Sequence, residues 1–349
     1  MDGRFRGLRR LTQAGGNGAF SLVFTAVDDV SGREVVIKCF HPDHRAGRYR
    51  LDSFAREAFL LGELAGQPDI IQRVGQPGQF TVPIPTALGV DMNVPFEYYG
   101  VERAYGTVAD LIGEGQWNYI HRLDAFRSMC RAVQRLHSLG VVHRDLKPDN
   151  FLVVAPGCVK ASDFGTARVL NGNMPPLHQN YATFWPGDTR YTAPEIIAGA
   201  LDQNPSAAIV GDIYSLGSIL FEILTGYRLS AEVYGSDFAV TLSAHMGHVP
   251  SVHRARVYDL FIGAMSDAYL LPDLSRLNSD LPHCIRARAN TLYRGLAALD
   301  YRARLTNFER IFQAINICTQ SLRREANIQR RTRFKRRLPH PPLPAVVVQ

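Results

Sequence analysis

The chain has 349 residues, of which 46% are apolar and 20% are charged, and its net charge is +7 at pH 7. These values are typical of a globular protein with two domains or lobes, whose core needs neither disulfides nor a structural metal. The five cysteines are scattered and none forms a CxxC pair, which excludes a secreted disulfide scaffold and a zinc ribbon.

The N-terminal third is rich in strand patterns. Residues 8–40 alternate apolar and polar positions, are rich in Val, Phe and Ile, and predict three antiparallel strands in a meander. Residues 52–65 change to helical spacing. Residues 67–95 are rich in Pro and Gly and predict short strands with loops, and 96–103 predicts a further strand. We therefore expect a small, strand-rich N-terminal part.

Helical patterns dominate the rest of the chain. Apolar residues recur at helical spacing over 126–136 and 213–224, while 151–154 and 158–161 predict short strands. Residues 228–290 look long and loop-rich, which suits a docking segment or a variable insertion. No run approaches 18 apolar residues, and no apolar stretch follows the basic N-terminus. We therefore expect a cytoplasmic chain without a membrane span or a signal peptide.

The positive charge is concentrated near the C-terminus. Residues 323–337 contain eight Lys/Arg and one acidic residue, so the rest of the chain is close to neutral. This segment continues a helical pattern, and a proline-rich end, 338–344, follows it. Binding to anionic lipid, to nucleic acid or to an acidic partner protein is conceivable, and so is a solvated, charged helix end.

Two features of the N-terminal part suit phosphate binding. Gly16 and Gly18 lie in a turn between two strands, where backbone N–H groups can approach phosphates closely, although a plain hairpin has the same pattern. A dinucleotide-binding fold is excluded because its glycine loop must open a helix. Lys38 ends a strand and Glu57 lies on the following helix, and a lysine held by a carboxylate can present its ammonium to two phosphates.

The strongest signal is a loop that is dense in polar residues. Residues 143–150 read His-Arg-Asp-Leu-Lys-Pro-Asp-Asn, and an Asp-Phe-Gly triplet begins at Asp163. Phosphoryl transfer needs these groups. The carboxylate of Asp145 would orient an attacking hydroxyl, the ammonium of Lys147 would neutralise the moving phosphoryl group, and Asn150 and Asp163 would hold Mg²⁺.

Together with Ala-Pro-Glu at 193–195 and Asp212 at the start of a helix, these motifs resemble the eukaryotic-like protein kinase family over about 8–320. The resemblance implies an α+β, two-lobed protein kinase fold over 1–322, followed by a tail, 323–349. The N-lobe, about 1–103, would hold a five-stranded sheet and one helix. The C-lobe, about 107–322, would be mostly helical, with ATP between the lobes.

The resemblance also implies roles for individual residues. Asp145 matches the catalytic base, Lys147 and Lys38 match the phosphate-binding lysines, and Asn150 and Asp163 match the Mg²⁺ ligands. Glu57 looks like the partner of Lys38, in preference to Glu63 on the same helix. The implied ATP-binding residues come from the glycine loop, strands, helix and hinge: Gly16, Asn17, Gly18, Ala19, Phe20, Ser21, Val23, Val36, Lys38, Glu57, Glu102, Ala104 and Leu152. Glu195 and Arg304 look like a structural ion pair.

The setting of Lys147 resembles that of Ser/Thr kinases, so we expect transfer of the γ-phosphoryl group of MgATP to Ser or Thr of protein substrates, with autophosphorylation. Arg144 would pair with a phosphate on the activation segment, at Thr183 or Thr189. The alternative is an activation segment that is ordered without phosphate.

Three positions depart from the family pattern. Ser21 replaces the third loop glycine. Val36 replaces an alanine and narrows the adenine pocket. Asp188 replaces the threonine that usually contacts the catalytic aspartate, unless Thr189 takes that role. The alternative is therefore a pseudokinase, a scaffold or nucleotide-gated switch that binds ATP with little or no turnover. A nucleic-acid-binding protein driven by its tail is a third possibility.

Overall fold

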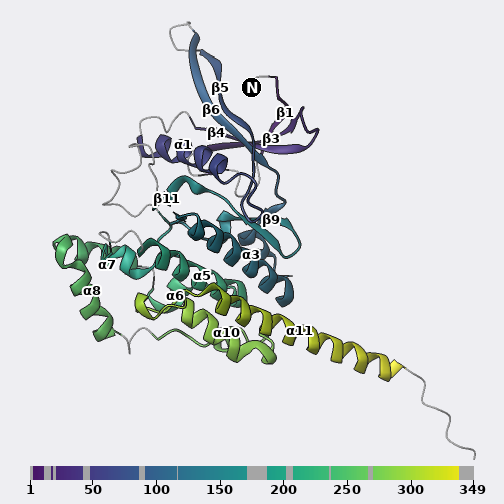
Figure 1. Ribbon diagram of the computed structural model, residues 1–349, viewed down its shortest axis with the longest axis vertical. Helices are drawn as coiled ribbons and strands as arrows, with labels where there is room; N and C mark the ends of the chain where they lie inside the picture. Colours follow the sequence, from purple (N-terminus) through teal and green to yellow (C-terminus); the bar gives the residue numbers. More distant parts are fainter. Residues whose placement is uncertain are drawn as a thin grey trace, which may run out of the picture.

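The computed structural model describes residues 3–11, 17–18, 21–41, 48–85, 91–115, 117–170, 187–201, 207–235, 237–265 and 270–337 of the chain. Figure 1 shows a lobe made of a curved sheet and one helix above a larger, helical lobe. The predicted α+β, two-lobed organisation is therefore confirmed.

The N-lobe is built on an antiparallel sheet. Its strands are β1 (Phe5–Arg10), β2 (Asn17–Gly18), β3 (Ser21–Asp28), β4 (Glu34–Phe40), β5 (Arg73–Pro85) and β6 (Asp91–Glu102). The order across the sheet is β1-β3-β4-β6-β5, and the short β2 pairs with β3 beside this path. Alternate side chains of β4, such as Val35, Ile37 and Cys39, are buried against one face, as the alternating sequence pattern predicts.

One helix, α1 (Arg48–Glu63), completes the N-lobe. Its Phe54 ring lies 5.5 Å from the ring of Phe40 on β4 and 4.9 Å from that of Tyr99 on β6, measured between centroids. The apolar residues that the helical spacing places on one face, from Phe54 to Leu64, are buried. The packing of these aromatic rings fixes α1 against the sheet.

The prediction of short strands and loops for 67–95 is wrong. Strands β5 and β6 form one long hairpin that rises out of the sheet (Figure 1). The prolines of β5 are tolerated because β5 is the edge strand, so their missing N–H groups cost no ladder bond on the open side. Pro95 lies in the part of β6 that extends beyond its pairing with β4.

The C-lobe is predominantly helical. Its helices are α2 (Val108–Glu114), α3 (Tyr119–Ser138), α4 (Pro194–Ile197), α5 (Ala207–Thr225), α6 (Leu229–Val233), α7 (Phe238–Gly247), α8 (Ser251–Met265), α9 (Leu274–Leu277), α10 (His283–Leu296) and α11 (Phe308–Arg337). Its short strands and turns are β7 (Gly106–Thr107), β8 (Val141–Val142), η2 (Pro148–Asn150), β9 (Phe151–Ala155), β10 (Cys158–Ala161), η3 (Phe164–Thr166), β11 (Arg168–Val169) and η5 (Tyr301–Ala303). The two predicted strands at 151–154 and 158–161 correspond to β9 and β10.

Helix α5 forms the centre of the C-lobe core. It packs against α3 and α10, and side chains such as Ile213, Leu216 and Leu220 are fully buried. By length and composition residues 208–225 are apolar enough to cross a membrane, contrary to the expectation that no run approaches this length. However, 83% of this stretch is buried inside the lobe, as in a core helix. Helix α5 is therefore a core helix of the C-lobe.

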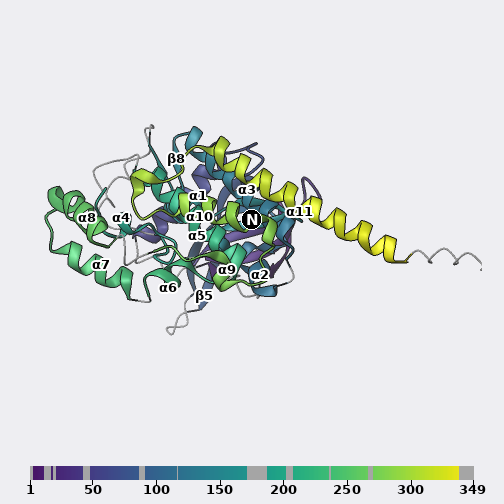
Figure 2. The same cartoon turned by 90° about the horizontal axis from the view of Figure 1, so that it is seen from below.

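The prediction that 228–290 is loop-rich is also wrong, because α6 to α9 and the start of α10 fall within it. In α8 exposed Val252 and Leu260 alternate with buried Tyr258 and Ile262, so no single apolar stripe marks this helix in the sequence. Figure 2 shows α7 and α8 at the end of the lobe opposite the long helix α11. Helix α11 packs against α3 and α10 and then projects from the body. The expected boundary between the domain and the tail, after residue 322, falls inside this helix.

Candidate active site

Strand β4 and helix α1 bring together the predicted lysine and glutamate. The ammonium of Lys38 lies 2.8 Å from Oε1 of Glu57, and both side chains are largely buried. Burial lowers the pKa of Lys38, but the attraction of Glu57 and Asp163 outweighs it and leaves this pKa above its ordinary value. The structure therefore holds a charged ammonium on the side of β4 that faces Asp163.

The catalytic-loop side chains converge on the carboxylate of Asp145. Its Oδ2 accepts hydrogen bonds from Lys147 Nζ and from Asn150 Nδ2, each at 3.1 Å, and Asn150 also donates to the Asp145 carbonyl at 2.7 Å. The backbone N–H of Asp188 donates to Oδ1 at 2.7 Å. Burial raises the pKa of Asp145, while Lys147 and the Asp188 N–H lower it, and the net shift is upward. A raised pKa makes this carboxylate a better proton acceptor.

The contact between Asp188 and Asp145 differs from the expected threonine contact. Neither the Asp188 side chain nor Thr189 reaches Asp145 by a hydrogen bond; the Asp188 backbone does so instead. The Asp188 carboxylate turns away and accepts from the Arg190 guanidinium, with Nε 2.8 Å from Oδ1. The position that departs from the family pattern thus still holds the catalytic carboxylate.

A buried carboxylate on α5 clamps the backbone of the catalytic loop. Oδ2 and Oδ1 of Asp212 accept from the N–H groups of His143 and Arg144, each at 2.9 Å, and His137 Nε2 lies 3.0 Å from Oδ2. Arg144 has a φ of 69°. A positive φ is strained for a residue with a side chain, so the surrounding bonds must impose it.

The second strained residue among those described is Asp163, with a φ of 62°. Behind it, His143 Nε2 lies 2.9 Å from the Ser162 carbonyl and Arg56 of α1 donates to the Gly165 carbonyl. Phe164 is fully buried. These contacts join α1, the catalytic loop and η3 into one unit, so the two strained backbones lie next to the groups expected to do the chemistry.

The oxygens expected to hold a metal are available. Because Asn150 uses its amide N–H groups on Asp145, its Oδ1 is left without a hydrogen bond to any residue that the structure describes. The same holds for the Asp163 carboxylate within the described ranges. Carboxylate and amide oxygens are the ligands that Mg²⁺ prefers. The residues present therefore fit a hard divalent cation.

Among the described residues, the predicted hinge has unpaired backbone groups at Ala104, whereas the N–H of Glu102 donates to the Gln72 carbonyl at 2.9 Å. Glu102 is fixed by its side chain, whose Oε1 accepts from Gln72 N at 2.8 Å and from Lys160 Nζ at 2.5 Å. Ala104 is half-buried, and its N–H and carbonyl make no hydrogen bond to any described residue. An unpaired, half-buried backbone amide is suited to the edge of a nucleobase.

The remaining predicted ATP-binding residues lie on β2, β3, β4 and β9 or outside the described ranges. Val23 is buried on β3, Val36 pairs with Val101 across the sheet, and Leu152 lies on β9. Asn17 and Gly18 pair with Leu22 and Ser21 as the start of the β2–β3 hairpin. Gly16, Ala19 and Phe20 lie outside the described residues, as does Thr183.

Away from the site, the predicted ion pair between Glu195 and Arg304 is confirmed. Both side chains are fully buried, and Nη2 of Arg304 lies 2.8 Å from Oε2 of Glu195. Arg304 also donates to the Val210 carbonyl at 3.0 Å and lies over the Tyr214 ring. Arg304 thus joins α4, through Glu195, to the segment after η5 and, through the Val210 carbonyl, to α5.

Two buried residues of the site were not foreseen. Tyr99 lies opposite Lys38 across the β4–β6 pair, with the Lys38 ammonium 6.0 Å from the ring centroid. Burial raises the pKa of Tyr99 well above its ordinary value, so the phenol stays neutral. Arg56 is buried beside Glu57. Alternation along β6 marks Tyr99 as a core residue, but no sequence signal shows that its ring faces a charged pair.

Two lobes, with two lysines and four acidic or amide side chains at the site they share, define the protein kinase class of fold. The chain matches the protein kinase domain over residues 10–315 and belongs to this family, whose members use ATP.

Two serine/threonine-protein kinases of bacteria are among the curated relatives. The chain is 31% identical over 257 residues to a probable serine/threonine-protein kinase, pknA2, of Bifidobacterium longum, which covers 72% of this chain and 30% of the relative. It is 30% identical over 261 residues to the serine/threonine-protein kinase PknA of Mycobacterium tuberculosis, which covers 71% of this chain and 52% of the relative. The matched segment thus spans about a third to a half of the length of these relatives.

Proposed function

We propose that the protein is a Ser/Thr protein kinase that transfers the γ-phosphoryl group of ATP to hydroxyls of protein substrates. The observation that carries this proposal is the convergence of Lys147, Asn150 and the Asp188 N–H on the carboxylate of Asp145. The lysine two residues after Asp145 and the similarity to serine/threonine-protein kinases favour Ser/Thr over Tyr as the acceptor.

The chain's own residues supply positioning and charge. Asp145 would orient the acceptor hydroxyl and take its proton, a contribution worth about 10²–10⁴ in rate. Lys147 and Lys38 would neutralise phosphate charge, and Ala104 would bind the nucleobase through its backbone. Asn150 and Asp163 would hold Mg²⁺, which supplies charge neutralisation of the phosphate oxygens when bound. This division of labour requires no covalent intermediate.

The pseudokinase alternative rests on Val36 and Asp188. The Asp188 backbone makes the contact to Asp145, which removes one of these two reasons. Val36 remains as a narrower adenine site. Phosphate turnover separates the two functions, because a scaffold would bind ATP without transferring its γ-phosphoryl group.

We also propose control by autophosphorylation of the activation segment. Arg144 is largely buried, and its electrostatic neighbours include Arg56 and Arg168. Burial, and after it the repulsion by the positive charge of Arg168, lowers the pKa of Arg144 to about 10. The positive charges of these three residues repel one another, and a phosphate placed among them would relieve that repulsion. Thr183 is the preferred acceptor, because Thr189 lines a cavity with Arg190 and Arg228 instead.

The basic end of α11 is a proposed partner-binding element. Arg323, Arg324, Arg330 and Arg331 are exposed on a helix that projects from the body (Figure 1). An acidic protein, an anionic lipid surface or nucleic acid would match their charge. Deleting 323–349 should abolish salt-dependent binding to the partner and leave phosphoryl transfer intact.

The location proposed for the domain is the cytoplasm. All five cysteines are free thiols, which suits a reducing compartment that also supplies ATP.

Mass spectrometry of the purified protein after incubation with MgATP tests the proposed function: phosphoserine or phosphothreonine supports it, and phosphotyrosine alone would overturn the Ser/Thr assignment. Phosphate at Thr183 in active enzyme supports the regulatory proposal, whereas full activity with an unmodified segment would refute it.

A further inference from the structure

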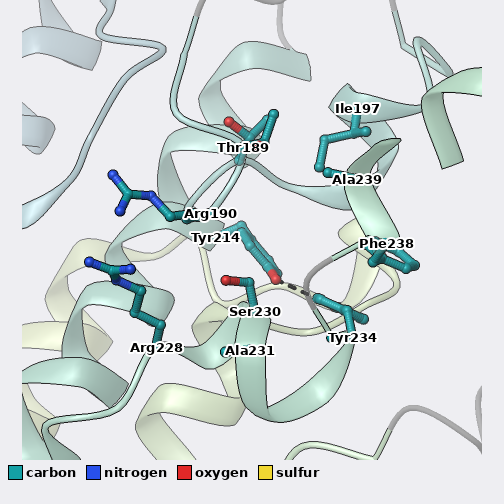
Figure 3. A pocket seen from close by; sticks show the side chains of 12 residues that line it. Thr189, Arg190, Ile197, Tyr214, Arg228, Ser230, Ala231, Tyr234, Phe238 and Ala239 are labelled. Carbon is teal, nitrogen blue, oxygen red and sulfur yellow. Dashed lines mark hydrogen bonds between the residues drawn. The ribbon is translucent and has the colours of Figure 1, made fainter. Parts of the chain in front are cut away.

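A cavity of about 270 Å³ lies between the 187–192 segment and helices α5, α6 and α7. Figure 3 shows Thr189 and Arg190 on one side, with Tyr234 and Phe238 across from them. The rings of Tyr234 and Phe238 are stacked with centroids 4.2 Å apart, and the Tyr214 hydroxyl donates to that of Tyr234 at 3.3 Å. The wall is therefore a fixed surface of apolar carbon and hydroxyl groups.

The cavity lining begins at the residue that follows the contact to the catalytic carboxylate. Asp188 donates its N–H to Asp145, and the next residue, Thr189, already lines the cavity. The lining thus begins one residue after the group that contacts Asp145, so the side chains next to an acceptor hydroxyl at Asp145 are the ones within reach of the cavity. The cavity is placed to read a side chain close to the phosphorylated residue.

Two guanidinium groups are the charged groups of the lining. In Figure 3 Arg190 and Arg228 project on the same side of the cavity. Arg190 is about half exposed and binds Asp188 through Nε and Nη2, which leaves its other edge open. Arg228 is also about half exposed, and its guanidinium makes no hydrogen bond to any residue that the structure describes; its Nε lies 3.9 Å from Oε1 of Glu222. No carboxylate belongs to the described lining.

The acidic residues that interact with the two arginines, Asp188, Glu222 and Asp149, do not belong to the described lining. Glu222 accepts a hydrogen bond from the Tyr191 hydroxyl at 2.7 Å, and neither Glu222 nor Asp188 lines the cavity. Their negative charges hold the two cations in place without occupying the cavity. A second carboxylate arriving from outside meets the exposed edges of pre-oriented guanidinium groups, which favours charge-assisted hydrogen bonds. A lysine or arginine side chain would meet like charge instead.

We propose that this cavity selects protein substrates with an Asp or Glu side chain close to the acceptor Ser or Thr, and that Arg228 and Arg190 are the residues that read it. The inference rests on the proposed kinase function and specifies its substrate class. The methylene groups of the acidic side chain would pack on the apolar wall, and its carboxylate would bind the two arginines at the rim.

The test uses the full chain and peptides with one Ser acceptor in a neutral background. Glu, Gln or Lys is placed in turn at each of the three positions on either side of the Ser, and kcat/KM is measured with MgATP. At one position we expect Glu to exceed Gln by about tenfold and Lys to fall below Gln. In Arg228→Gln the Glu/Gln ratio at that position should fall to about one, whereas Arg228→Lys should retain part of the preference. Arg256→Gln, at an exposed position on α8, is the matched control and should keep the full ratio.

The outcomes separate this inference from the proposed function. Autophosphorylation is followed in the same samples, with folding of each variant checked by circular dichroism. Phosphoryl transfer with a Glu/Gln ratio near one at every position would overturn the acidic specificity and leave the kinase function standing. A preference that survives unchanged in both Arg228→Gln and Arg190→Gln would also overturn it. The absence of phosphoryl transfer by the unmutated protein would contradict the kinase function, and this inference with it.

Discussion

The backbone N–H of Asp188 donates a hydrogen bond to Oδ1 of Asp145 at 2.7 Å, while the Asp188 carboxylate binds Arg190. A side chain that differs from the family pattern thus leaves the catalytic carboxylate positioned, because the contact is made by the main chain. Within this one residue, the backbone positions Asp145 and the side chain binds Arg190.

This separation predicts different effects of two substitutions. Asp188→Asn retains the N–H and should lower kcat for a neutral peptide by less than about fivefold, because the side chain makes no hydrogen bond to Asp145. Asp188→Pro removes the N–H and should lower kcat by about tenfold or more. Steady-state kinetics with thermal unfolding as the folding control checks this. Equal losses in the two folded variants would show that the side chain, not the backbone, supports Asp145.

The pH dependence of turnover should report Asp145. This carboxylate must be ionised to accept a proton, so kcat falls as the pH falls through its pKa. Burial raises the pKa above the ordinary 3.8, and Lys147 opposes that rise. Lys147→Met removes the opposing cation, so the acid limb of the kcat profile should move to higher pH. An acid limb that stays in place, or moves to lower pH, would contradict the assignment of Asp145 as the base.

The Lys38–Glu57 pair gives a test with a control on the same helix. Glu57→Gln keeps a hydrogen-bond acceptor but removes the charge beside the Lys38 ammonium, and we expect kcat/KM for ATP to fall by about tenfold. Glu63 is exposed at the end of α1, and Glu63→Gln should leave kcat/KM within about twofold. If Glu63→Gln had the larger effect, the pairing seen here would not be the functional one.

The buried pair Glu195–Arg304 should carry stability rather than catalysis. Arg304→Met leaves Glu195 buried without its cation and should lower the free energy of unfolding by about 3–5 kcal/mol. The double variant Glu195→Gln/Arg304→Met removes both charges and should recover part of that loss. Urea unfolding measures both quantities. Additive losses in the double variant would mean that the two residues do not act as a pair.

Local patterns predicted the parts of the fold in which one face is buried. The meander over 8–40, the apolar face of α1 and the stripes of α3 and α5 follow from periodicity. The hairpin β5–β6 could not be predicted in this way, because prolines usually argue against a strand and its edge position is a tertiary property. Helix α8 was not predicted because its apolar residues are distributed over both its exposed and its buried sides and form no single stripe.

The site shows the same division. Motif spacing predicted Lys38, Asp145, Asn150 and Asp163, and the structure brings them together across elements far apart in the sequence. The sequence did not indicate that Arg190 and Arg228 share one cavity, because that depends on how α6 folds back over α5. Nor did it indicate that the Asp188 backbone would serve Asp145, because every residue except proline offers that N–H.

Transfer of the γ-phosphoryl group by the purified protein, measured with radiolabelled ATP and Mg²⁺ beside Asp163→Ala, tests the central claim most directly. The account predicts label on Ser or Thr in the unmutated protein and a loss of at least about hundredfold in the variant, whose fold should be retained. No label in the unmutated protein, or equal label in both, would contradict the assignment of this site to phosphoryl transfer.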